Sequence, residues 1–164
     1  MPSPRRPGDV PIEGAPAHSD DTATLTFIGR VRSAHATTQD APKNPTKARE
    51  HGAPASLEIE APYRPGLQGL AAYSHLIVLG WLHQARRDLI QITRPSDLGS
   101  KGVFALRSPV RPNPISLSVA RIVSVDIATG RIEIDAIDLL DGTPIVDIKP
   151  YRPGIDAVPD AVVP

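Results

Sequence analysis

Two arginines four residues apart are the side chains of this sequence best suited to binding an anion. Arg107 and Arg111 alternate with three prolines in the segment LRSPVRPNPIS. Each proline fixes its own φ at about −65° and pushes the preceding residue toward an extended conformation, so the segment should form neither a helix nor an interior strand. A rigid loop holds guanidinium groups in set directions, which favours binding of an anionic ligand. The alternative is a structural turn whose arginines pair with nearby carboxylates.

A second group of polar side chains lies in the segment IDLLDGTPIVDIKPY, which contains Asp138 and Asp141. Asp141 and Gly142 predict a bend, and Pro144 stiffens its exit. The two carboxylates either contact a ligand or neutralise the arginines of the preceding loop in a structural ion cluster. The sequence leaves both interpretations open.

Other common catalytic chemistries have little support. The chain has no cysteine, which excludes disulfides, thiolate zinc sites and cysteine nucleophiles. No two histidines have the spacing of a helical metal motif, and no serine lies in a nucleophile elbow. His83 and Gln84 end the apolar segment HLIVLGWLHQ, where His83 is either a ligand contact or a solvated strand-end residue. We expect no metal site.

The composition sets the remaining bounds. The chain has 164 residues, which suits one domain with its own core. Its 18 basic and 18 acidic side chains cancel, so any contact with nucleic acid must come from a local patch. No apolar run approaches the roughly 20 residues that span a bilayer, and the N-terminus does not resemble a secretory signal. We expect a soluble, cytoplasmic protein that does not bind membranes.

Strand signals dominate the chain. Residues 1–21 contain five prolines and few apolar side chains, which predicts a disordered tail before a single domain over residues 22–164. Strand patterns occur at 25–33, 56–60, 75–84, 117–126 and 131–140, the last two forming a hairpin, and a long polar loop covers 35–54. Helical periodicity is nearly absent. The sequence predicts an all-β fold with long loops, in which one antiparallel sheet closes into a barrel.

Three of these segments together resemble the signature of the TsaA-like, or TrmO-type, family of S-adenosylmethionine-dependent tRNA methyltransferases. They are SHLIVLGWLHQ, GVFALRSPVRPNPISLS and LLDGTPIVDIKPY, and the resemblance covers roughly residues 25–160. It implies a single-sheet β-barrel that forms homodimers. It also implies transfer of a methyl group from S-adenosylmethionine to N6 of threonylcarbamoyladenosine at position 37 of tRNA, beside the anticodon.

The same resemblance implies that S-adenosylmethionine contacts Pro42, Lys43, Asn44, His83, Gln84, Arg107, Leu117, Asp141, Gly142 and Thr143. By hypothesis, Leu140 joins Leu117 in an apolar slot for the purine. The chemistry of the implied reaction suggests further roles: Asp138 or Asp141 would accept a hydrogen bond from the adenine amino group. Phosphate contacts with the tRNA anticodon loop would come from Arg111, Lys149 and Arg152.

Two departures from the family pattern leave alternatives open. Larger members carry an additional C-terminal domain, which we do not expect in this chain, and Ser116 stands where a glycine often follows the isoleucine of the loop. One alternative is an S-adenosylmethionine-binding barrel that acts as a sensor or as a non-catalytic RNA-binding module. The other is a methyltransferase that acts on a small metabolite.

Overall fold

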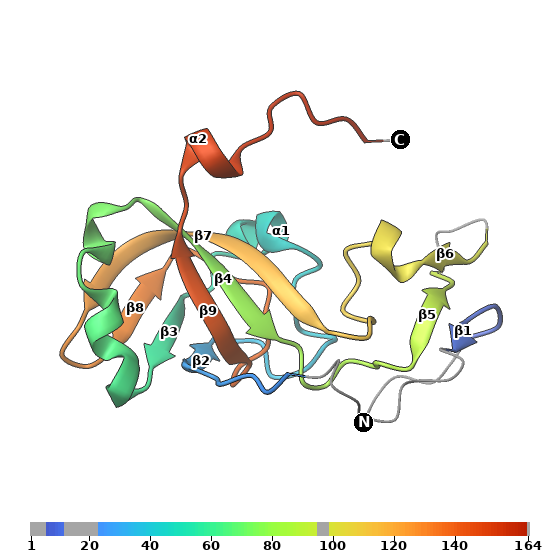
Figure 1. Ribbon diagram of the computed structural model, residues 1–164, viewed down its shortest axis with the longest axis horizontal. Helices are drawn as coiled ribbons and strands as arrows, with labels where there is room; N and C mark the ends of the chain where they lie inside the picture. The colour runs from blue at the N-terminus through green and yellow to red at the C-terminus, as the bar shows by residue number, and fades with distance from the viewer. Residues whose placement is uncertain (1–5, 12–22, 95–98, 164) are drawn as a thin grey trace. The chain divides into compact units, whose positions relative to one another are not determined.

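The protein divides into two compact units, each described here by itself. The computed structural model describes residues 6–11, 23–94 and 99–163. Unit 1 comprises Met1–Thr26 and Trp81–Ser116, and unit 2 comprises Phe27–Gly80 and Leu117–Pro164 (Figure 1). The strands are β1 (Val10–Pro11), β2 (Gly29–Arg32), β3 (Ala55–Ile59), β4 (His75–Trp81), β5 (Leu89–Ile92), β6 (Lys101–Gly102), β7 (Ile115–Asp126), β8 (Arg131–Ile134) and β9 (Pro144–Pro150). The helices are α1 (Pro45–His51) and α2 (Pro153–Asp156), and the 3₁₀ segments are η1 (Ala61–Leu67), η2 (Leu70–Ala72) and η3 (Val103–Ala105).

Six antiparallel strands make up the main sheet. Their pairing order is β2-β3-β8-β7-β4-β9, and β2 pairs with β3 on one side and with β9 on the other, so the order returns to its start. Along β2 the side chains alternate between buried and exposed, as the period of a strand requires. Six large side chains from these strands are fully buried and form the core of unit 2: Val31, Leu57, Leu76, Val78, Ile132 and Ile145. The predicted antiparallel β fold with little helix is confirmed.

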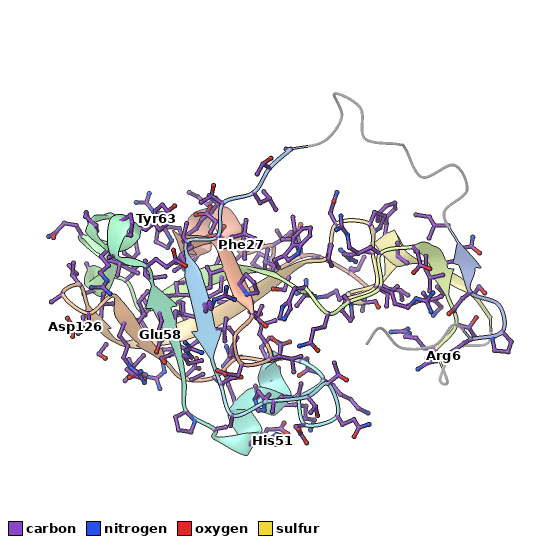
Figure 2. The ribbon with its side chains drawn as sticks, turned by 90° about the horizontal axis from the view of Figure 1, so that it is seen from below. Arg6, Phe27, His51, Glu58, Tyr63 and Asp126 are labelled. Atoms are coloured by element: carbon purple, nitrogen blue, oxygen red, sulfur yellow. The ribbon has the colours of Figure 1, made fainter. Side chains whose placement is uncertain are left out.

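The predicted hairpin is present as β7 and β8. Asp126 pairs with Arg131, and Gly130 between them has a φ of 77°, a conformation that favours glycine. The carboxylate of Asp126, which Figure 2 labels, accepts hydrogen bonds from the Thr129 hydroxyl and from the Ala128 amide. These hydrogen bonds lower the pKa of Asp126. β8 is shorter than the predicted strand 131–140, because the chain leaves the sheet after Ile134.

Unit 1 contains a second sheet that the sequence analysis did not anticipate. Strands β1, β5 and β6 pair in the order β1-β5-β6. Its core consists of Leu89, Ile92, Val103 and Leu106. The expectation of a single sheet was therefore incomplete, because the pattern at 89–92 is too short to predict a strand.

Two segments for which the sequence predicts neither strand nor helix contain short elements. Within the tail that we expected to be disordered, β1 pairs with β5, and residues 1–5 and 12–21 lie outside the described part of the chain. The loop at 35–54 contains helix α1, which begins after Asn44. No helix in the described ranges has the length and apolar character needed to cross a bilayer.

Candidate functional site

The turn at Asp141 and Gly142 is shaped by backbone hydrogen bonds in unit 2. The Asp141 amide donates to the His35 carbonyl oxygen at 2.8 Å, and the Gly142 amide donates to the Val31 carbonyl oxygen at 2.9 Å. Gly142 has a φ of 74°, and a Cβ added there would meet no atom within 4 Å. Thr143, whose exposed fraction is 2%, anchors the turn in the core. The turn is thus fixed, with open space beside its glycine.

Strand β2 and the residue after it orient the Asp141 side chain. The Ser33 amide donates to Asp141 Oδ1 at 3.2 Å, and the Arg32 guanidinium lies 3.7 Å from Asp141 Oδ2. The Ser33 hydroxyl donates to the Leu139 carbonyl oxygen at 2.8 Å. The carboxylate is therefore exposed yet held in one direction, an arrangement that suits an ammonium or hydroxyl ligand.

The second candidate carboxylate, Asp138, lies beside strand β7. Ser118, which is 2% exposed, donates its hydroxyl hydrogen to Asp138 Oδ1 at 3.0 Å. The neighbouring Leu117 is 47% exposed, and Leu140 is half-buried. The segment from Asp138 to Gly142 therefore carries two carboxylates and one partly exposed leucine, and the exposed Leu117 precedes the serine that contacts Asp138.

The predicted triplet Pro42, Lys43 and Asn44 leads into helix α1. Asn44 is the N-cap, and its Oδ1 accepts a hydrogen bond from the Lys47 amide at 2.9 Å. Pro42 is buried and Lys43 is exposed. Asn44 thus has a structural role in this helix, whatever ligand contact its amide also makes.

Helix α1 is fastened to the sheet by one arginine. Arg49 donates to Asp135 Oδ2 at 2.9 Å and to the Val119 carbonyl oxygen at 2.7 Å. Partial burial tends to raise the pKa of Asp135, but hydrogen bonds from the Arg121 amide and from Arg49 outweigh it and hold that pKa below 3.8. This pair connects the triplet's helix to the segment that leads to the Asp141 turn.

In unit 1, His83 and Gln84 lie just beyond the end of β4 rather than in a strand. Both are exposed, and Gln84 Nε2 lies 3.5 Å from His83 Nε2. The Leu82 amide donates to the Pro114 carbonyl oxygen at 2.8 Å, so the histidine segment lies beside the proline-rich loop. The structure therefore brings two of the predicted segments together within this unit.

The two arginines of the loop have different surroundings. Arg111 is half-buried and donates to three backbone carbonyl oxygens, those of Ser108 at 3.1 Å, Val103 at 3.0 Å and Leu106 at 2.6 Å. Val103 and Leu106 belong to the core of unit 1, so Arg111 fastens the loop to that core. These contacts favour the structural alternative for Arg111 over a phosphate contact. Arg107 is exposed.

Lys149 and Arg152, the other predicted phosphate contacts, lie on the surface of unit 2. Lys149 Nζ is 2.8 Å from Asp147 Oδ2, and the hydrogen bond with Asp147 raises the pKa of Lys149. Arg152 donates to the Tyr73 hydroxyl oxygen at 2.9 Å, which raises the pKa of Arg152. Both cations are exposed, which an RNA contact requires.

The residues that position the turn were not predicted from the sequence. Arg32 and Ser33 orient Asp141, and Arg30 donates from Nη1 to the Gly142 carbonyl oxygen at 3.1 Å. The signal available was the alternation GRVR, which places Arg30 and Arg32 on the outer face around the buried Val31. What the alternation does not reveal is which distant turn lies next to that face.

Comparison with known proteins identifies the family. The model of the tRNA-methyltransferase O N-terminal domain matches residues 30–157, and the chain belongs to this family.

Relatives of different lengths match this chain. An S-adenosyl-L-methionine-binding protein of Archaeoglobus fulgidus is 40% identical over 131 residues, which cover 80% of this chain and 91% of the relative. The tRNA (adenine(37)-N6)-methyltransferase of Escherichia coli is 38% identical over 142 residues, covering 82% of this chain and 60% of that enzyme. The crystal structure of TrmO from Pseudomonas aeruginosa matches with a TM-score of 0.69 and 38% identity, covering 86% of this chain and 61% of that one. The chain thus spans about three fifths of the length of these two longer relatives.

Proposed function

We propose that this protein is an S-adenosylmethionine-dependent methyltransferase that methylates N6 of threonylcarbamoyladenosine at position 37 of tRNA. The observation that carries the proposal is the 38% identity with the tRNA (adenine(37)-N6)-methyltransferase of Escherichia coli, which extends over 82% of this chain. The proposal that the substrate adenosine carries a threonylcarbamoyl group rests on the family resemblance of the three sequence segments.

The residues present suit S-adenosylmethionine. The amino-acid part of that molecule carries an ammonium and a carboxylate, which match the exposed Asp141 carboxylate and the exposed Arg107 guanidinium. Leu117 and Leu140 offer apolar surface for a purine, and the open space beside Gly142 leaves room for a ligand close to the backbone. We propose that the remaining cofactor contacts are those named above at residues 42–44, 83–84 and 143.

When bound, S-adenosylmethionine supplies a methyl group on a positively charged sulfur. The protein's task is then to align the adenine amino group with that methyl and to exclude water, and such positioning accounts for about 7–11 kcal/mol in well-oriented reactions. Asp138 suits the role of accepting a hydrogen bond from the amino group, because Ser118 fixes one of its oxygens and the other has no partner in the described part of the chain. Asp141 remains the alternative for this role.

A methyl-transfer assay tests the proposal. Purified protein is incubated with methyl-labelled S-adenosylmethionine and two preparations of bulk tRNA, one with and one without the threonylcarbamoyl group, and the labelled nucleoside is identified by chromatography. We expect label at N6 of threonylcarbamoyladenosine and none in the unmodified RNA. Tight cofactor binding with no label in either RNA would contradict the proposal.

One observation favours a second candidate function. Two relatives that this chain covers almost completely, at 91% and 98% of their length, are named as an S-adenosyl-L-methionine-binding protein and a probable one, whereas it covers 60% of the Escherichia coli methyltransferase. A binding barrel that senses the cofactor would bind S-adenosylmethionine without turnover. The assay above distinguishes the two functions, because only the enzyme consumes the cofactor.

We further propose that residues 22–164 work as one domain, that its cyclic strand order forms the expected β-barrel, and that the protein is a cytoplasmic homodimer. The pairing of β2 with both β3 and β9 supports the barrel. The homodimer rests on the family resemblance. Sedimentation equilibrium tests it, with a mass of twice the 17.5 kDa chain as the expected result.

A further inference from the structure

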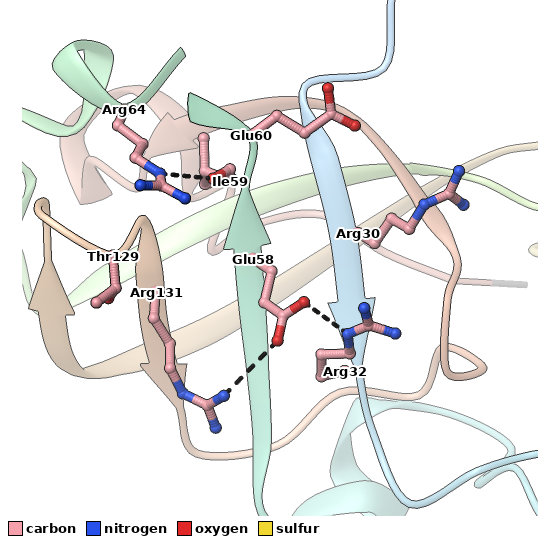
Figure 3. Close-up of a pocket in the computed structure, with 8 residues that line it drawn as sticks. All are labelled: Arg30, Arg32, Glu58, Ile59, Glu60, Arg64, Thr129 and Arg131. Carbon is pink, nitrogen blue, oxygen red and sulfur yellow. Dashed lines mark hydrogen bonds and ion pairs between the residues drawn. The ribbon is translucent and has the colours of Figure 1, made fainter. Parts of the chain in front are cut away.

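A cavity of about 510 Å³ lies on the outer face of unit 2, and none of the site residues predicted from the sequence lines it (Figure 3). We name it the arginine groove. Its lining residues are Arg30, Arg32, Glu58, Ile59, Glu60, Arg64, Thr129 and Arg131.

Strand register explains why these charges gather. Arg30 on β2 pairs with Glu58 on β3, and Glu58 pairs in turn with Arg131 on β8. Paired residues of neighbouring strands project on the same face, so the three side chains form one row across the sheet. Arg32, two residues after Arg30, projects on the same face.

The residues that line the groove include more basic than acidic side chains. Four arginines and two glutamates give the lining a formal charge of plus two, while Asp141 and Glu133, outside the lining, pair with Arg32 and Arg131. Arg32 lies 2.7 Å and Arg131 3.8 Å from the Glu58 carboxylate, as the dashed lines in Figure 3 show. The hydrogen bond and charge of Glu58 raise the pKa of Arg32. Arg32 also lies 3.7 Å from the Asp141 carboxylate, and Arg131 lies 2.5 Å from that of Glu133, so both guanidinium groups are paired with carboxylates.

The other two arginines bond to backbone and not to carboxylates. Arg30 donates to the Gly142 carbonyl oxygen, while Arg64 donates to those of Ile59 at 3.3 Å and Ala128 at 2.9 Å. Within the described residues neither forms an ion pair. These contacts hold the two cations in set directions, so binding an anion there costs little side-chain entropy.

The surface of the groove indicates the chemical class of the ligand. Its one apolar lining residue, Ile59, is 3% exposed, and no aromatic side chain lines the groove, so it offers nothing for a base to stack on. Its cations lie on η1 and on β2 and β8, the two strands that flank β3, and β2 and β8 are roughly 10 Å apart at the usual strand spacing. That width exceeds one phosphate and suits successive phosphates of a chain.

We propose that the arginine groove binds the phosphodiester backbone of RNA. This inference rests on the proposed function, in which tRNA is the substrate. Arg30 and Arg32 contact Gly142 and Asp141, so RNA in the groove would lie beside the turn assigned to the cofactor.

Two substitutions with opposite expected effects test the groove. A fluorescent anticodon stem-loop RNA is titrated with the protein at several salt concentrations, without S-adenosylmethionine. In Arg30→Gln we expect weaker binding and a salt dependence whose log–log slope is smaller by about 0.7–0.9. In Glu58→Gln we expect tighter binding and a steeper slope, because the groove loses one negative charge, and Arg32 and Arg131 each lose one of two carboxylate partners. A substitution that merely disturbs folding would not strengthen binding.

Arg121→Gln is the matched control, because Arg121 is an exposed arginine of the same unit on β7 that does not line the groove. We expect its RNA affinity and slope to equal those of the wild type. Equal slopes for the wild type, Arg30→Gln and Glu58→Gln would overturn the proposal, as would a wild type that binds no RNA.

Competition identifies other occupants. If inorganic phosphate binds with an affinity that depends on Arg30 while RNA binding does not, the groove binds single anions and the RNA assignment is wrong. If polyglutamate displaces RNA as effectively as polyphosphate does, the groove binds an acidic protein segment and the RNA assignment is wrong. The titration involves no methyl transfer, so it tests the groove independently of the proposed enzymatic function. If RNA binding responds to the groove variants but the protein shows no turnover, the groove proposal holds and the proposed enzymatic function fails.

Discussion

In the proline-rich loop of unit 1, one side chain holds the backbone in place, whereas the Asp141 turn of unit 2 is also held by hydrogen bonds of its own backbone amides. Arg111 donates to three carbonyl oxygens of its own loop region. At the turn, the amides of Asp141 and Gly142 donate to carbonyl oxygens of the β2 region. A charged residue in a loop is therefore not by itself a ligand contact, and its partners decide whether it shapes the site or faces the ligand.

The difference between Arg107 and Arg111 illustrates this point. Both are arginines of one short segment, and the sequence assigns both to binding. Arg111 is half-buried against the core of unit 1, while Arg107 is exposed. Substitution should separate the two roles, because loss of a structural arginine lowers stability and loss of a ligand contact lowers affinity.

The largest effect is expected for Arg111→Ala. The substitution removes a charged donor from three backbone carbonyl oxygens, two of them at core residues, and should lower the free energy of unfolding by about 2–3 kcal/mol. Urea denaturation followed by fluorescence of the single tryptophan measures it. Arg111→Lys, which keeps the charge but loses the planar fork, should recover little of the loss. A stability equal to that of the wild type would contradict the structural role of Arg111.

The next effect concerns the backbone of the turn. Gly142→Ala places a Cβ on a residue with a φ of 74°, so it should lower the free energy of unfolding by about 1–2 kcal/mol from backbone strain alone. Gly66→Ala is the control, since Gly66 also has no atom within 4 Å of an added Cβ but lacks a positive φ. If both variants unfold at the same urea concentration, the turn does not depend on its left-handed residue.

A smaller, pH-dependent effect is expected where the segment leading to the turn meets helix α1. Partial burial raises the folded-state pKa of Asp135, but hydrogen bonds from the Arg121 amide and from Arg49 outweigh it and lower that pKa from its usual value. Its ionised form therefore stabilises the fold above the unfolded pKa, and that contribution is lost as the pH falls through the folded value. Asp135→Asn should be less stable than the wild type at pH 7, and the difference should shrink below about pH 4. Thermal melts from pH 7 to pH 3 measure it. A difference that stays constant over this range would exclude an ionic role.

The sequence predicts local patterns better than the partners of individual side chains. The β7–β8 hairpin follows from alternation on both sides of a glycine turn. Helix α1 was missed although Asn44 followed by Pro45 is a common helix start, because a seven-residue helix shows little periodicity. β4 ends at Trp81, so His83 lies beyond the strand that its apolar run suggested.

The candidate site was predicted less completely. The bend at Asp141 and Gly142 follows from local residue preferences, but the contacts of Asp141 with Arg32 and Ser33 join positions about a hundred residues apart. Arg111 has local partners, yet its role depends on the 3₁₀ segment η3, which presents the Val103 and Leu106 carbonyl groups. The arginine groove arises from the register of three strands, which local sequence does not specify.

The most direct test of the account compares Arg107→Ala with Asp141→Asn by calorimetric titration of S-adenosylmethionine, with urea denaturation of each variant. We expect each substitution to weaken cofactor binding at least about tenfold, since each removes a charged side-chain group that we propose forms a hydrogen bond with the ligand. Their free energies of unfolding should stay within about 0.5 kcal/mol of the wild type, because both residues are exposed. Undiminished affinity in both variants would contradict the claim that the loop and the turn supply the charged contacts to the cofactor.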